Sequence, residues 1–167
     1  MAKPDDDSGD SPLGRQLKAE FDAALAGHYD PILILLKAHL YIENLLERII
    51  VASLKRGDRV FENTRLSFFQ KLVLVDSLDT VPDNVITSVR HLNTLRNGIA
   101  HQIERSISEA DVRRLGDPLG EVFQRARAQN HYSTNIGFNT IVAYVCGFLA
   151  AKVEKLETPT RPKTSEG

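Results

Sequence analysis

Apolar residues recur every three or four positions along most of the chain, and this spacing places them on one face of an α-helix. Polar stretches that contain glycine or proline separate these segments, as is typical of helix ends. The pattern therefore predicts an all-α fold, an up-and-down bundle of about five to six helices. The expected helices cover 13–26, 31–54, 66–78, 84–104, 108–128 and 134–156.

Two of these helices have specific start signals. Asp30 and Pro31 are the residue types favoured at an N-cap and at the first helical position, so they predict the start of the second helix. Ser108 and Asp111 have the spacing of a capping box, which predicts a helix start there.

Two further segments affect the expected helices. Gly116 and Pro118 are expected to break or kink the helix that begins after Ser108. The run 141–148 has a high β-propensity, but we expect a helix there because the sequence offers no partner strand.

The two ends of the chain differ in composition from the middle. Residues 1–12 are polar and acidic, and residues 157–167 are rich in polar residues and proline, so both are expected to be disordered tails around one helical domain over 13–156. The start has no apolar stretch typical of a secretory signal. The apolar runs 32–42 and 141–151 are shorter than the roughly 20 residues of a membrane span. We therefore expect a cytoplasmic protein with no membrane association.

Charge and cysteine content narrow the function classes. The formal net charge is −1, which argues against a domain that binds nucleic acid through a high overall positive charge. A local basic groove is still compatible with this net charge. The one cysteine, Cys146, lies in an apolar run and is expected to be a small buried side chain. The sequence contains no Cys/His cluster with zinc spacing and no glycine-rich phosphate loop. We expect no metal and no cofactor.

The second helix is apolar around most of its circumference, although it contains Glu43. A helix that is apolar on nearly all sides must be covered on more than one of them. In so small a domain, one cover is expected to be another subunit.

The helix over 84–104 contains a charge on its apolar face. At about 100° per residue, Arg96 falls in the same stripe as Val89, Leu92 and Ile99. An unpaired buried cation is very costly, so Arg96 requires an anionic partner or faces an anion-binding site. Glu43 is the simplest candidate partner. Their pair would be either a structural salt bridge, which is slightly favoured, or a device that orients Arg96 for a phosphate.

The polar side of this helix carries Asn97 and His101, which are four positions apart and so adjacent on the helix surface. Arg96 and His101 are five positions apart, about 140° around an ideal helix, and do not point together. They can converge if Arg96 reaches round, if the helix is distorted, or if a second subunit contributes to the site. Gly98 lies between them and suits close approach of a backbone or ligand.

The segment Arg96-Asn97-Gly98-Ile99-Ala100-His101 resembles the signature of the HEPN family: an arginine, a polar residue that is often Asn, and then a histidine. The apolar helix leading into it, and an earlier helix with an internal acidic residue, also resemble that family. In specific residues the resemblance covers about 92–102, and in architecture about 31–156.

The resemblance implies a metal-independent endoribonuclease in which a ribose 2′-hydroxyl attacks the adjacent phosphate. His101 would act as general base or acid, Arg96 would bind the phosphate and stabilise developing charge, and Asn97 would hydrogen-bond the phosphate or orient His101. Glu43 would support the motif. The family typically forms its cleft at a two-fold interface, so the resemblance implies a homodimer that binds RNA.

Alternatives from other classes remain open. The chain could be a toxin-like or defence-related ribonuclease with a neutralising antitoxin or other regulatory protein partner. It could instead be a non-catalytic dimerisation or regulatory module, since many HEPN-like proteins act as scaffolds. A helical transcriptional regulator ranks last, because no helix-turn-helix with a basic recognition helix is recognisable. Arg90, Asn93 and His91 are possible substrate-binding residues, although a surface role is favoured for His91.

Overall fold

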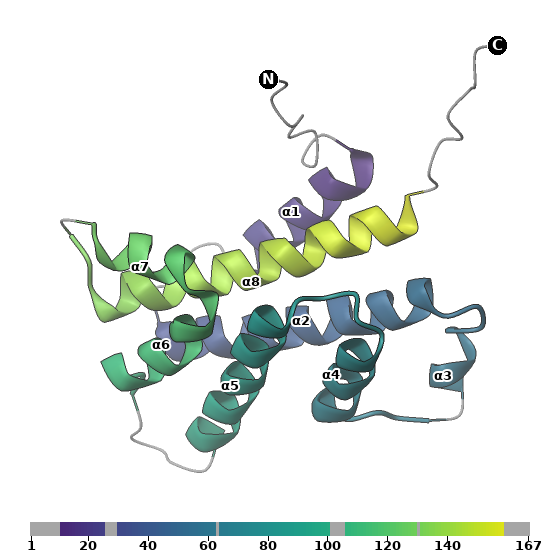
Figure 1. The fold of residues 1–167 in the computed structure, drawn as a ribbon, viewed down its shortest axis with the longest axis horizontal. Coiled ribbons are helices and arrows are strands. Elements are labelled where there is room, and N and C mark those ends of the chain that lie inside the picture. The colour runs from purple at the N-terminus through teal and green to yellow at the C-terminus, as the bar shows by residue number, and fades with distance from the viewer. Residues whose placement is uncertain (1–10, 26–29, 63, 101–105, 130, 159–167) are drawn as a thin grey trace.

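The computed structural model describes residues 11–25, 30–62, 64–100, 106–129 and 131–158, and this part of the chain is helical, without a strand (Figure 1). The predicted all-α class is confirmed, although the helices are more numerous and some are shorter than expected. They are α1 (Pro12–Leu25), α2 (Pro31–Ser53), α3 (Arg59–Glu62), α4 (Phe68–Ser77), α5 (Asp83–Ala100), α6 (Glu109–Gly116), the 3-10 turn η1 (Asp117–Leu119), α7 (Glu121–Arg127) and α8 (Thr134–Glu157).

The two longest helices, α2 and α8, pack against each other along the molecule and form the centre of the bundle (Figure 1). Helix α1 covers both of them on one side, and the antiparallel pair α4 and α5 packs on α2. Helices α6 and α7 pack on the first half of α8. Apolar side chains from these helices join in one buried core, whose burial is the main stabilising contribution to the fold.

The predicted helix starts are confirmed by their caps. The Asp30 side chain accepts a hydrogen bond from Ile32 N at 2.9 Å, and Pro31 takes the first turn of α2. Ser108 and Asp111 form the expected capping box of α6. The break at Gly116 is also confirmed, because α6 ends there.

Other boundaries differ from the prediction. The connector after α2 contains the four-residue helix α3, where a loop was expected. Helix α4 begins at Phe68 and not Leu66, because Ser67 forms a capping box with Gln70 that the apolar pattern did not reveal. The expected helix ends at Ala26 and Glu104 lie outside the described residues.

Helix α8 is, among the described residues, the one helix long and apolar enough to cross a membrane by length and composition alone. Its buried side chains, including Phe138, Val145 and Leu149, belong to the core shared with α2. A core helix of a globular protein meets the same test, and α8 lies at the centre of this bundle.

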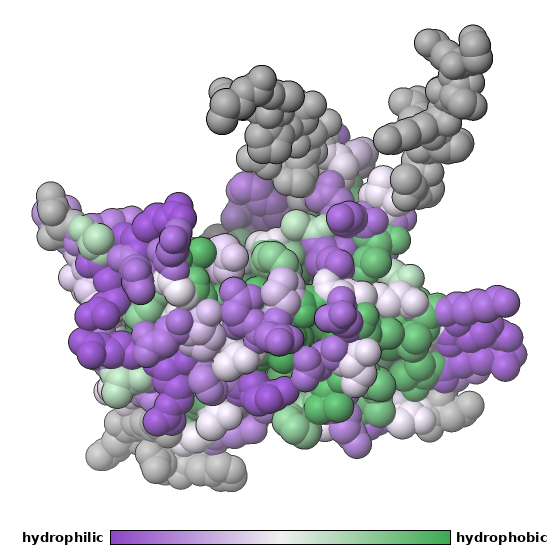
Figure 2. All heavy atoms as spheres, in the orientation of Figure 1, coloured by the Kyte–Doolittle hydropathy of each residue, from purple (hydrophilic) through white to green (hydrophobic). Residues whose placement is uncertain are grey.

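The surface is unevenly apolar. In the view of Figure 2, apolar residues gather over and beside α4, whereas polar residues dominate over α6 and α7. Phe69 and Val73 of α4 are large exposed apolar side chains, as are Leu36, Leu40 and Val51 of α2. Large apolar patches of this kind are typical of interaction sites.

Candidate functional site

Helices α2, α4 and α5 meet around a polar cluster inside otherwise apolar surroundings. His39 of α2 is only 7% exposed, and its ring stacks on Phe68 of α4 with centroids 4.0 Å apart. His39 Nε2 donates a hydrogen bond to Asn93 Oδ1 of α5 at 3.0 Å, because an amide oxygen can only accept. One side chain therefore ties together three helices next to the Arg96 motif.

The environment keeps His39 neutral. Burial lowers its pKa from the ordinary value near 6.5, with a further lowering by the charges of Arg96 and Lys71. The hydrogen bond to Asn93 and the charge of Glu43 act in the opposite direction but are outweighed. In the sequence, His39 is one polar position on a mostly apolar helix, which indicates a structural or interface role and not a place in the candidate site.

Glu43 pairs with Lys71 of α4 and not with Arg96, so the expected Glu43–Arg96 pair is wrong. Lys71 Nζ lies 2.6 Å from Glu43 Oε1 and 2.6 Å from Glu47 Oε1. Burial alone lowers the pKa of Lys71, but its hydrogen bonds to both carboxylates outweigh this and raise it. Lys71 is a buried residue of α4, the helix that packs on this part of α2, whereas the apolar pattern of α4 gives no sign that a lysine lies on its buried side.

Arg96 is half-buried at the C-terminal end of α5, and Arg96 Nη1 donates to Asn97 Oδ1 at 3.2 Å. Among the described residues, no carboxylate lies within salt-bridge distance of Arg96. The guanidinium has five N–H donors, so most of them remain available. Of the three predicted catalytic residues, the structure brings Arg96 and Asn97 together, whereas His101 lies outside the described residues.

The three possible substrate-binding residues are engaged in packing α5 against its neighbours. Arg90 Nη2 lies 3.2 Å from Asp76 Oδ2 of α4. His91 Nδ1 donates to the carbonyl oxygen of Arg114 in α6 at 2.6 Å. Asn93 accepts from His39, as described. Arg90 and His91 thereby have structural partners on either side of α5, and Asn93 alone belongs to the polar cluster.

A small cavity of about 160 Å³ lies between α5 and α6, beside the motif. Its walls include His91, Thr94 and Gly98 of α5 and Asp111 and Arg114 of α6. Gly98 therefore lines this cavity, and its expected role in close approach of a backbone or ligand stays a prediction. The cavity does not reach the His39–Asn93 cluster.

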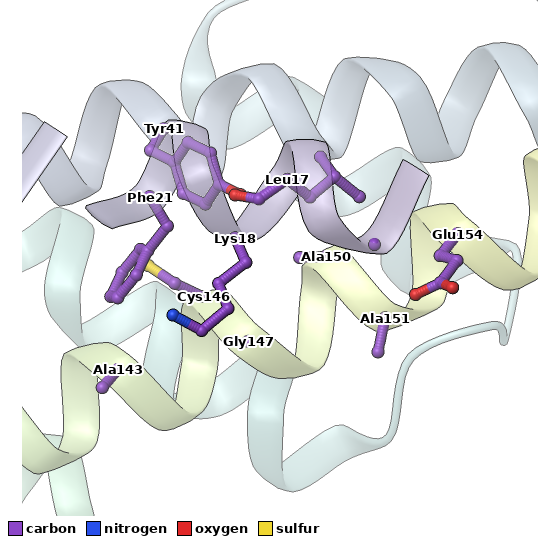
Figure 3. Close-up of a pocket in the computed structure, with 11 residues that line it drawn as sticks. Leu17, Lys18, Phe21, Tyr41, Ala143, Cys146, Gly147, Ala150, Ala151 and Glu154 are labelled. Carbon is purple, nitrogen blue, oxygen red and sulfur yellow. The ribbon is translucent and has the colours of Figure 1, made fainter. Parts of the chain in front are cut away.

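A second cavity, of about 180 Å³, lies between α1 and α8, remote from α5 (Figure 3). Apolar residues and small residues line it, together with the charged side chains of Lys18 and Glu154. Cys146 is fully buried beside it, and burial raises the pKa of its thiol, so the thiol stays protonated and unreactive. Burial likewise raises the pKa of Tyr41 to about 12, and the Tyr41 hydroxyl donates to Leu17 O at 2.9 Å. The thiol of Cys146 and the phenol of Tyr41 are thus both protonated near neutral pH.

No three His, Cys, Asp or Glu side chains within the described ranges lie close enough together to hold a metal ion. Two polar pairs of the described chain meet at the C-terminal half of α5: Arg96 with Asn97, both of α5, and Asn93 of α5 with His39 of α2.

Comparisons with family models, with curated proteins and with solved structures gave no match to this chain.

Proposed function

We propose that the chain is a HEPN-like, metal-independent endoribonuclease that cuts RNA through its ribose 2′-hydroxyl. The observation that supports it best is the state of Arg96. Arg96 is half-buried, its guanidinium donates to the Asn97 side-chain oxygen, and it has no carboxylate partner among the described residues. A cation in this state favours an anionic ligand, and His101 follows five positions later.

In the proposed reaction, an imidazole base removes the proton of the 2′-hydroxyl, and the 2′-oxygen attacks the adjacent phosphorus. The bond from phosphorus to the 5′-oxygen breaks, and that oxygen takes a proton from an acid. The products are a 2′,3′-cyclic phosphate and a 5′-hydroxyl. His101 suits base or acid work because an imidazole titrates near neutral pH. Arg96 suits stabilisation of the negative charge that grows on the phosphate oxygens.

The proposal includes a cytoplasmic homodimer with the cleft shared between copies. Exposed apolar side chains on α2 support a second copy on this face: Leu36, Leu40 and Val51 lie within about 60° of one another around the helix, and Leu40 is 66% exposed. A toxin or defence role, with a neutralising partner, belongs to the same proposal.

The test is incubation of the purified chain with mixed cellular RNA in EDTA. Wild type should cut the RNA, and Arg96→Ala and His101→Ala should each reduce the rate by about 100-fold or more, as expected when a transition-state donor or a general acid–base is removed. Circular dichroism must show that both variants are folded. Equal cleavage by all three proteins would contradict the catalytic roles assigned to Arg96 and His101.

A second candidate is a non-catalytic dimerisation or regulatory module. It is favoured by the mutual bonding of Arg96 with Asn97 and of His39 with Asn93, since both pairs can serve packing alone. This candidate predicts that Arg96→Ala changes stability or partner binding, while neither it nor wild type cuts any RNA.

A further inference from the structure

The two asparagines of the cluster have their side-chain oxygens already bonded. Asn93 Oδ1 accepts from His39 Nε2 at 3.0 Å, and Asn97 Oδ1 accepts from Arg96 Nη1 at 3.2 Å. A side-chain amide has one oxygen and one nitrogen at opposite corners of its plane. Each bond therefore fixes which way its amide is turned, and leaves the Nδ2 group of that asparagine facing elsewhere.

Both Nδ2 groups are available. Neither Nδ2 group has a hydrogen-bond partner within the described part of the chain. In that part, the buried side-chain atoms that lack a partner are Ser53 Oγ and Thr80 Oγ1, so the two Nδ2 groups are unpaired but not buried. Asn97 is exposed and Asn93 is half-buried, so solvent reaches both amides. The two residues are four positions apart on α5 and hence neighbours on its surface.

The charge beside these amides is positive. Arg96 stands between them in sequence and retains N–H donors beyond the one that Asn97 uses. The carboxylates of Glu43 and Glu47 are held by Lys71, and that of Asp76 is held by Arg90. These three carboxylates of α2 and α4 therefore each have a cationic partner other than Arg96.

From this arrangement we infer that Asn93, Arg96 and Asn97 form a phosphate-oxygen cradle, and that His39 is the positioning residue that turns the Asn93 amide nitrogen outward. The inference rests on the proposed function for its natural ligand, an RNA phosphodiester. It gives Asn93, one of the possible substrate-binding residues, the role of a phosphate donor, and it adds His39 as the residue that positions Asn93. His39 is buried against Phe68 and acts on the ligand only through Asn93.

Four variants separate the cradle from simple packing. Asn93→Asp keeps the shape and still accepts from His39, but replaces two N–H donors by a negative charge. His39→Gln keeps an N–H donor for Asn93, whereas His39→Leu fills similar space without one. Asn97→Asp is the matched change on the next turn, and it keeps an acceptor for Arg96.

The experiment is titration of the full chain with inorganic phosphate, followed through the side-chain amide resonances of Asn93 and Asn97 by NMR. In wild type and His39→Gln both amides should shift along one binding curve. His39→Leu should weaken phosphate binding about 10-fold, and Asn93→Asp and Asn97→Asp by about 10- to 100-fold, the range expected for losing hydrogen bonds to a charged ligand. If His39→Leu does not fold, Asn93→Asp and His39→Gln decide the matter.

An Asn93 amide that does not respond to phosphate in wild type would overturn the inference, as would equal phosphate binding by wild type and folded His39→Leu. Failure of the cradle is distinguishable from failure of the proposed function. RNA cleavage without a response of the Asn93 amide to phosphate would refute the cradle alone. A response of the Asn93 amide without RNA cleavage would refute the proposed ribonuclease activity and leave a phosphate-binding site.

Discussion

His39 couples the stability of the three-helix junction to pH. Its pKa is lowered chiefly by burial, so the folded state binds the proton more weakly than the unfolded chain does. The charged groups acting on it are Arg96 of α5, Lys71 of α4 and Glu43 of its own helix. The stabilisation due to neutral His39 is therefore complete above about pH 6.5, the unfolded value, and is lost as pH falls through the lower folded value.

We predict that wild type loses more stability than His39→Gln between pH 7 and pH 5, because glutamine does not titrate. Urea unfolding at each pH measures the difference, and the other histidines are common to both proteins. A wild-type loss equal to or smaller than that of the variant would contradict a lowered His39 pKa.

Lys71 provides a second prediction at the residue scale. Its side chain is 7% exposed, whereas Glu43 and Glu47 are 28% and 40% exposed. Removing both carboxylates leaves the buried Lys71 cation without an anionic partner. The double variant Glu43→Gln/Glu47→Gln should therefore lower the free energy of unfolding by about 3 kcal/mol. Lys71→Met leaves two carboxylates that water can reach, and should cost only about 1 kcal/mol. Chemical denaturation measures both, and a larger cost for Lys71→Met would refute this account of the junction.

The sequence revealed part of this site and not the rest. Arg96 could be found because a charge on an apolar stripe is visible from helical periodicity, and Asn97 because it follows Arg96 in the segment that ends at His101. The partners of Glu43 and Asn93 could not, because they depend on which helices pack together and on the rotation of each about its axis. Periodicity specifies a buried face but not the neighbour that covers it.

At the scale of elements, two helical glycines should respond oppositely to alanine. A methyl group at Gly116 would overlap the ring of Phe123, whereas one at Gly147 of α8 meets nothing within 4 Å. Alanine is the better helix former by about 1 kcal/mol, so Gly147→Ala should stabilise by up to that amount. Gly116→Ala should destabilise by about 1–3 kcal/mol through overpacking. Thermal unfolding compares them, and stabilisation by both would show that Phe123 moves aside.

The elements themselves were largely predictable, because strong local signals and the global packing agree. Asp30 and Pro31 define the start of α2, and the long apolar pattern of α8 specifies a central helix. The short helix α3 and the start of α4 were missed, since a four-residue helix has almost no period and the Ser67 capping box lay inside a polar connector.

At the scale of the whole molecule, the exposed apolar face of α2 predicts self-association. Leu40→Glu should convert a dimer into a monomer, because it places a charge at the centre of that face. Ile136→Glu, at an exposed apolar position on α8, is the matched control and should leave the dimer intact. Light scattering on the purified proteins measures the mass. A wild-type monomer, or a dimer that persists in Leu40→Glu, would contradict this assignment of the interface.

The most direct test of the central claim is cleavage of one end-labelled RNA oligonucleotide in EDTA, with a matched oligonucleotide that carries a single 2′-deoxyribose at the cut position. The account predicts a 2′,3′-cyclic phosphate end on the product and no cut at the substituted position, because the 2′-oxygen is the nucleophile. Cutting that continues at the 2′-deoxy position, or a complete absence of cutting in any RNA, would contradict the proposed ribonuclease.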